Sequence, residues 1–199
     1  MKSNVCKIDK GNKDLELILK ESEKVAVYNE LNHKQTLQLR LLCEEIDGML
    51  PEIIDDFDGD FWMEFEDGVC KIHVSIALSD LTLEKKQDLI NIAKNKKNAA
   101  SVGVVGKIRA SIENFFLDED VADAFAMSAG MSHMSTGCYE GLYCSYYWSL
   151  DQYRTTIKSE EKVDDWDELE KSVIASVADD VIVGVKGNKA DIIIVKKFA

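Results

Sequence analysis

The chain has 199 residues, of which 46% are hydrophobic and 31% are charged, and its formal net charge is -13 at pH 7. This length and apolar content suffice for one buried core, so we expect a single domain spanning residues 1–199. The excess of carboxylates argues against a nucleic-acid or anionic-membrane surface, because the long-range field would repel both. Five cysteines without a CxxC pair, no signal peptide and no membrane-length apolar run favour a cytoplasmic protein.

Two helices are predicted at the start of the chain. Apolar residues recur at helical spacing in residues 13–29 and again in residues 39–53, where Leu, Ile and Met share one face. Gly48 and Pro51 are unfavourable inside a helix. We therefore expect the second helix to kink or restart near them.

A β-hairpin and a third helix are predicted next. Apolar and polar residues alternate in 61–65 and again in 70–78, and Asp67-Gly68 between them suits a tight turn. Residues 79–93 begin with capping side chains and continue with helical spacing.

A glycine-led helix follows the basic loop 94–98. Gly103 and Gly106 lie three residues apart at its start, and Lys107 comes directly after them. Glycines in this position let an anion approach the free N–H groups and the positive end of the helix dipole, which is how proteins hold phosphates. They serve close helix–sheet packing equally well, so the pattern leaves both interpretations open.

The last third of the chain has a weaker pattern. Residues 117–164 show no clear periodicity and are treated as an insertion before the last helix, which is expected near 166–177; a hairpin over 181–195 then closes the chain. This order of elements predicts an α/β (α+β) two-layer sandwich, with helices on one face of a mixed β-sheet.

The order of elements, an acidic pair before the hairpin and the glycine-led helix together resemble the ATP-binding domain of histidine kinases, anti-sigma serine kinases, gyrase B and Hsp90. The resemblance to these histidine-kinase-like (Bergerat-fold) ATPases covers residues 13–116 and 165–198. It implies ATP as the ligand and, as in anti-sigma regulators, a protein partner.

Three motifs of that family have counterparts here. The family's first helix has a Glu, used as a base in some members, and a magnesium-ligating Asn four residues later; Glu44 and Glu45 match the Glu, but the Asn position falls on Gly48 or Met49. Mg²⁺ binding is therefore doubtful, and phosphoryl transfer depends on that ion. The resemblance gives two more contacts, an adenine-binding Asp matched by Asp80 without its neighbouring glycines, and a phosphate-covering box matched by Gly103, Gly106 and Lys107.

Several of these side chains also have plainer interpretations. Glu44 could be a solvated helix-surface carboxylate, and Asp80 could cap the helix that follows it. Cys43 and Cys70 fall on apolar faces and are expected to be packed core thiols, whereas His73 falls on the polar face of its strand and is expected to be exposed.

The 117–164 segment offers two further possibilities. His133, Cys138 and Cys144 could contribute to a metal site, although their spacing matches no common zinc pattern. Its aromatic residues could line a pocket or interface, or be half-buried strand residues; they are Tyr139, Tyr143, Tyr146, Tyr147, Trp148 and Tyr153.

Two functions follow from the sequence. The first is a nucleotide-binding regulatory protein that binds ATP between the Glu44 helix, Asp80 and the start of the Gly103/Gly106 helix. The second is a catalytically silent interaction module that has kept the fold, has lost nucleotide chemistry and works through its tyrosine-rich insertion.

Overall fold

The computed structural model describes residues 1–9, 15–54, 57–77, 103–114, 135–139, 142–160, 172–186 and 189–198. Its elements in chain order are β1 (Cys6–Asp9), α1 (Leu15–Tyr28), α2 (His33–Ile53), β2 (Asp58–Glu66), β3 (Val69–Ala77), α4 (Gly103–Asn114), β4 (Ser135–Tyr139), β5 (Leu142–Ser149), α6 (Leu150–Glu160), α8 (Val173–Val177), β6 (Asp180–Lys186) and β7 (Lys189–Lys197).

One seven-stranded sheet has the order β1-β2-β3-β7-β6-β5-β4, so the first and last hairpins lie side by side at its centre. Every strand pairing among the described residues is antiparallel. The mixed sheet expected from the sequence is therefore corrected to an antiparallel one. The expectation was wrong because the β3–β7 contact, which joins distant parts of the chain, also runs antiparallel.

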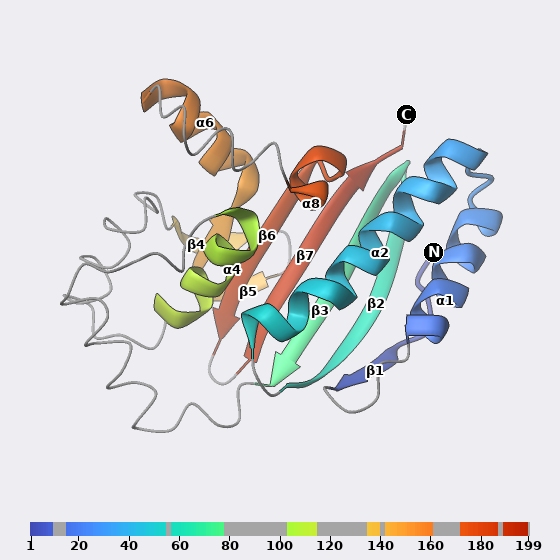
Figure 1. The fold of residues 1–199 in the computed structure, drawn as a ribbon, viewed down its shortest axis with the longest axis horizontal. Helices are drawn as coiled ribbons and strands as arrows, with labels where there is room; N and C mark the ends of the chain where they lie inside the picture. The colour runs from blue at the N-terminus through green and yellow to red at the C-terminus, as the bar shows by residue number, and fades with distance from the viewer. Residues whose placement is uncertain are drawn as a thin grey trace.

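Helices α1, α2, α4 and α8 lie on one face of this sheet (Figure 1), which confirms the two-layer α+β sandwich. The core between the layers comes from the alternating strand residues and the apolar helix stripes predicted above. Its largest fully buried side chains include Phe61, Met63, Ile72, Ile76 and Ile192 from the sheet and Leu39, Leu42 and Ile46 from α2.

Helix α2 begins with a capping box. The side chain of Asn32 accepts from the Gln35 backbone N–H, and the side chain of Gln35 accepts from the Asn32 backbone N–H. Contrary to expectation, the helix continues through Gly48 and Pro51 to Ile53. Pro51 leaves the Asp47 carbonyl without its intrahelical partner, and the helix ends two residues later, so little of the helix follows this interruption.

Both predicted hairpins are confirmed. Between β2 and β3, Asp67 and Gly68 have φ values of 49° and 76°, the left-handed pair that a tight two-residue hairpin turn requires. Earlier in β2, Gly59 leaves no room for a side chain, since a Cβ atom there would lie 2.5 Å from the Ser75 carbonyl oxygen of β3.

Part of the predicted insertion belongs to the sheet and its cover. Strand β5 pairs with β6, β4 extends the sheet beyond β5, and α6 follows β5 directly. Two polar side chains connect this part to the sheet and to α8. The carboxylate of Asp180 accepts the Asp151 backbone N–H at the start of α6, and Arg154 of α6 donates to the carbonyl oxygens of Ala175 in α8 and of Ala178 and Asp179 directly after it. The helix expected over 79–93 lies outside the described residues.

Candidate functional site

The expected site lies between α2 and α4, which pack against each other, while α1 lies on the other side of α2 (Figure 1). Six of the seven predicted site residues are described, and Asp80 lies outside the described residues. Three of the six lie on α2 and the other three lie on α4.

Glu44 lies in an ion-pair chain that leads toward α1. Its carboxylate is 3.0 Å from Arg40 Nε, and Nη1 of Arg40 is 3.3 Å from Glu23 of α1. All three side chains are substantially exposed to solvent. A general base is usually held in a sheltered position beside the reacting group, whereas Glu44 is exposed and paired with a guanidinium. The plainer interpretation of Glu44, a solvated surface carboxylate, describes this geometry.

Glu45 and Gly48 are placed differently. Glu45 is half-buried and, being one residue further along the helix, is rotated by about 100° from Glu44, away from α1. Gly48 is exposed, and no heavy atom of the described ranges lies within 4 Å of the position that a Cβ would occupy. Met49, the alternative position for the family's Asn, is buried in the core. Neither position offers an oxygen ligand for magnesium.

Helix α4 begins at Gly103, whose φ of 74° is in the left-handed region that favours glycine. Among the residues that the structure describes, none has a heavy atom within 4 Å of a Cβ position at Gly103. Gly106, one turn on, is buried. Gly103 thus lies half-buried at the helix start and Gly106 is buried within the helix, and phosphate binding by this segment stays a prediction.

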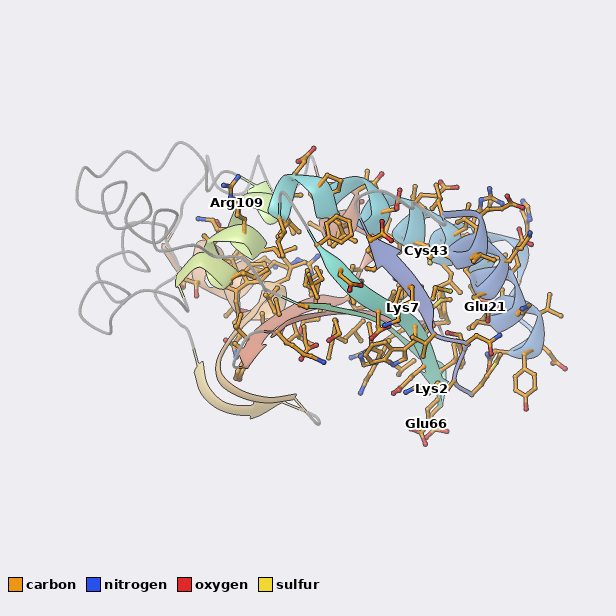
Figure 2. The ribbon with its side chains drawn as sticks, turned by 90° about the horizontal axis from the view of Figure 1, so that it is seen from below. Lys2, Lys7, Glu21, Cys43, Glu66 and Arg109 are labelled. Atoms are coloured by element: carbon orange, nitrogen blue, oxygen red, sulfur yellow. The ribbon has the colours of Figure 1, made fainter. Side chains whose placement is uncertain are left out.

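Lys107 does not extend from this helix start into solvent. It is buried, and its Nζ lies 5.1 Å from the centre of the Tyr153 ring of α6, a cation–π contact. By contrast, Arg109, two residues after Lys107, is exposed and projects from α4 away from the sheet (Figure 2). The structure therefore places the Lys107 ammonium group against α6, where it contributes to packing.

The aromatic residues of the 117–164 segment are structural where they are described. Trp148 and Tyr153 are buried, with ring centres 5.9 Å apart, and Tyr147 packs against a small apolar cluster of Ile182, Ile193 and Val195 on the other face of the sheet. The expected interface through this segment therefore has little exposed aromatic surface among the described side chains. His133 lies outside the described residues.

The sequence patterns did not predict a polar cluster that lies on the face of the sheet not covered by helices. Trp62 and His73 stack with ring centres 4.8 Å apart and planes 2° from parallel, and both Lys2 and the Trp62 indole N–H donate to the Glu64 carboxylate. Figure 2 shows Lys2 on this open side. His73 was expected to be exposed but is mostly buried, because Trp62 covers it; the cross-strand pairing of two alternating strands was the signal that could have revealed this.

Burial dominates the chemistry of His73. Its Nε2 has no hydrogen-bond partner in the part of the chain that the structure describes, and it lies 3.7 Å from a Glu64 carboxylate oxygen. Desolvation lowers the pKa of His73, against the opposing effect of Glu64. The imidazole is therefore neutral at pH 7, and the stack is a packing element of the sheet.

Comparisons with protein-family models, curated proteins and solved structures find no match for this chain. Within the described ranges, no helix has the length and apolar character to cross a membrane. The same residues contain no group of three or more His, Cys, Asp or Glu side chains arranged to hold a metal ion.

Proposed function

We propose that this protein is a regulatory interaction module that has the histidine-kinase-like ATPase architecture and acts by binding a protein partner without transferring phosphate. One observation supports this most directly. In the described part of the chain, every exposed large hydrophobic side chain lies within the first 41 residues, on the segment before β1, on α1 and on α2. Among them, Leu37 and Leu41 lie one turn apart on the outer side of α2, and exposed apolar side chains that lie together are typical of protein-binding sites.

The positions of the expected catalytic groups support the second part of the proposal. Phosphoryl transfer needs a base or water-positioning group and a metal-neutralised phosphate held in one place. Here Glu44 is paired with Arg40, Gly48 has no side chain, and Lys107 packs on Tyr153. The resemblance in element order therefore concerns the fold, and the proposal assigns this chain no phosphoryl-transfer chemistry.

Nucleotide binding is the second candidate, and the geometry of Gly103 favours it. Gly103 is a left-handed glycine at the start of a 12-residue helix, with no described residue within 4 Å of its Cβ position, and the N–H groups of a helix start can bind a phosphate. Under this alternative, ATP or ADP binds without a need for magnesium and acts as a regulatory ligand.

Thermal unfolding with ATP, ADP and a non-hydrolysable ATP analogue, each with and without magnesium, separates these alternatives, because a ligand that binds the folded state raises Tm by mass action. Phosphate release is measured in the same samples. The proposal expects no shift and no phosphate release at millimolar nucleotide. A magnesium-dependent shift with phosphate release would refute it, and a magnesium-independent shift would establish the second candidate.

If a shift appears, a matched pair of glycine variants locates it. Gly103→Val adds a side chain at the start of α4, and Gly48→Val adds the same side chain at another exposed position with open space. Because a β-branched residue at a positive φ is strained, the ligand-induced change in Tm is compared within each variant, not the absolute Tm. Loss of the shift in Gly103→Val alone assigns the ligand to α4.

A further inference from the structure

Helix α2 has two distinct faces. Its core-facing residues, Leu39, Leu42, Cys43, Ile46, Met49, Leu50 and Ile53, are buried against the sheet and α1. On the opposite side, Leu37 and Leu41 have 51% and 36% of their surfaces exposed. Exposed leucines one turn apart on the solvent side of a helix are not needed for the fold of this domain.

The outer face continues with a regular spacing. Leu37, Leu41, Glu44 and Gly48 are separated by four, three and four residues, the repeat with which one helix faces another in a coiled coil. We call these four positions the outer seam of α2. Gly48 leaves open space at the end of the seam, where a partner side chain can approach the backbone.

Helix α1 adds an apolar border to this seam. Glu23 of α1 contacts Arg40 of α2, which fixes how the two antiparallel helices lie beside each other. One turn from these residues, toward the loop that joins the helices, lie Val27 on α1 and Leu37 on α2. Val27 is 79% exposed. Val27 is therefore an exposed apolar side chain on α1 at the level of Leu37 on α2.

The charges beside the seam indicate the charge of the partner that would bind there. In the seam's heptad, the flanking positions after Leu41 are Glu45, Asp47 and Glu52, and residues 42–54 contain no Lys or Arg. Carboxylates in the last turns of a helix are unfavourable, because they lie near the negative end of its dipole. They become favourable when a cationic partner faces them, since flanking charges select the partner helix in such pairs.

We propose that the outer seam of α2, together with Val27, is a docking surface for an amphipathic helix whose apolar stripe is bordered by Lys and Arg. A second copy of this chain fits poorly, because each copy has a net charge of -13 and would place carboxylates against carboxylates. The inference deepens the proposed function and rests on it, since it names the class of partner that the module binds.

The test uses a fluorescent synthetic helix about three heptads long, with Leu at the seam positions and Lys at the flanking positions. Its affinity for the full chain is measured by anisotropy in the absence of nucleotide. The double variant Leu37→Gln/Leu41→Gln should weaken binding by at least about tenfold, since two partly buried leucines lose their apolar contact. Leu17→Gln is the matched control, because Leu17 is 45% exposed on α1 but lies outside the seam.

A charge reversal tests the choice of partner. Glu45→Lys/Asp47→Lys should weaken binding of the Lys helix and strengthen binding of the same helix with Glu in place of Lys. Equal affinity in the wild type and the leucine double variant would overturn the proposal, as would a wild-type dimer that this variant dissociates in analytical ultracentrifugation. Phosphate release from ATP would refute the proposed function but would leave this binding result unchanged, so the two failures are distinguishable.

Discussion

Asp180 holds the junction of β5, α6 and β6, so its replacement should reveal how firmly the 135–160 region is fixed to the sheet. Its Oδ1 accepts from the backbone N–H groups of Asp151 at 3.0 Å and Val181 at 2.8 Å, and from the Ser149 hydroxyl at 3.1 Å. Oδ2 accepts from that hydroxyl at 3.2 Å. One oxygen thus takes part in three of the four contacts.

Asp180→Ala removes the acceptor for all of them. Loss of the helix-start contact costs about 1 kcal/mol, and a partly buried donor left without a partner costs about 1–2 kcal/mol more, so we expect a destabilisation of roughly 2–3 kcal/mol. Asp180→Asn keeps an oxygen in the Oδ1 position and should cost about 0.5 kcal/mol or less. Urea unfolding at constant m-value measures both. Equal losses in the two variants would refute the hydrogen-bond argument.

The pH dependence of the same pair gives a second test. Desolvation is the largest effect on the pKa of Asp180 and raises it, against the hydrogen bonds that favour the carboxylate. Because the folded pKa lies above the unfolded value of about 3.9, the contribution of this group to stability is complete below that value and is lost as pH rises through the folded pKa. Wild type should therefore gain stability relative to Asp180→Asn on acidification toward pH 4, and a constant difference would contradict this.

Three further predictions follow from burial and backbone contacts. Gly59→Ala should destabilise by at least about 1–3 kcal/mol because its Cβ meets a β3 carbonyl oxygen at 2.5 Å, whereas Gly48→Ala, with open space, should stabilise by up to about 1 kcal/mol; urea midpoints compare them. The lowered pKa of His73 predicts stability that is complete above about pH 6.5 and falls below it, a slope that His73→Gln should abolish. Burial raises the pKa values of Cys43 and Cys70, the latter to about 12, so native protein should resist a thiol reagent that labels both in urea, and stability should fall as pH rises above about 9.

The regular parts of the fold could be predicted because their local patterns are strong. Alternation in β2 and β3 gave a hairpin whose turn, Asp67-Gly68, has the backbone angles it needs. The helical stripe of α2 gave its buried residues, and Cys43 and Cys70 are packed core thiols as expected. Strand β1 was not predicted, because four residues at a sheet edge have too short a pattern to recognise.

The candidate site was harder to predict because it depends on contacts between distant segments. The orientation of Glu44 follows from Arg40 and from Glu23 on the neighbouring helix, and the burial of Lys107 follows from Tyr153, a residue of α6. A motif match supplies residue types and spacing, but it does not supply these partners. The helix start at Gly103 could therefore be predicted from the sequence, whereas the side chains that face it could not.

The same limitation explains why the outer seam of α2 was not recognised in the sequence. A helix is assigned from its strongest apolar stripe, and in α2 that stripe contains the seven buried residues. In the sequence, Leu37 and Leu41 look like further members of that stripe. The packing shows instead that they lie on the opposite side of the helix from the buried residues. Because these leucines are not part of the buried core, their exposure and the carboxylates beside them need a separate explanation. The proposed cationic amphipathic helix would contact both the leucines and the carboxylates.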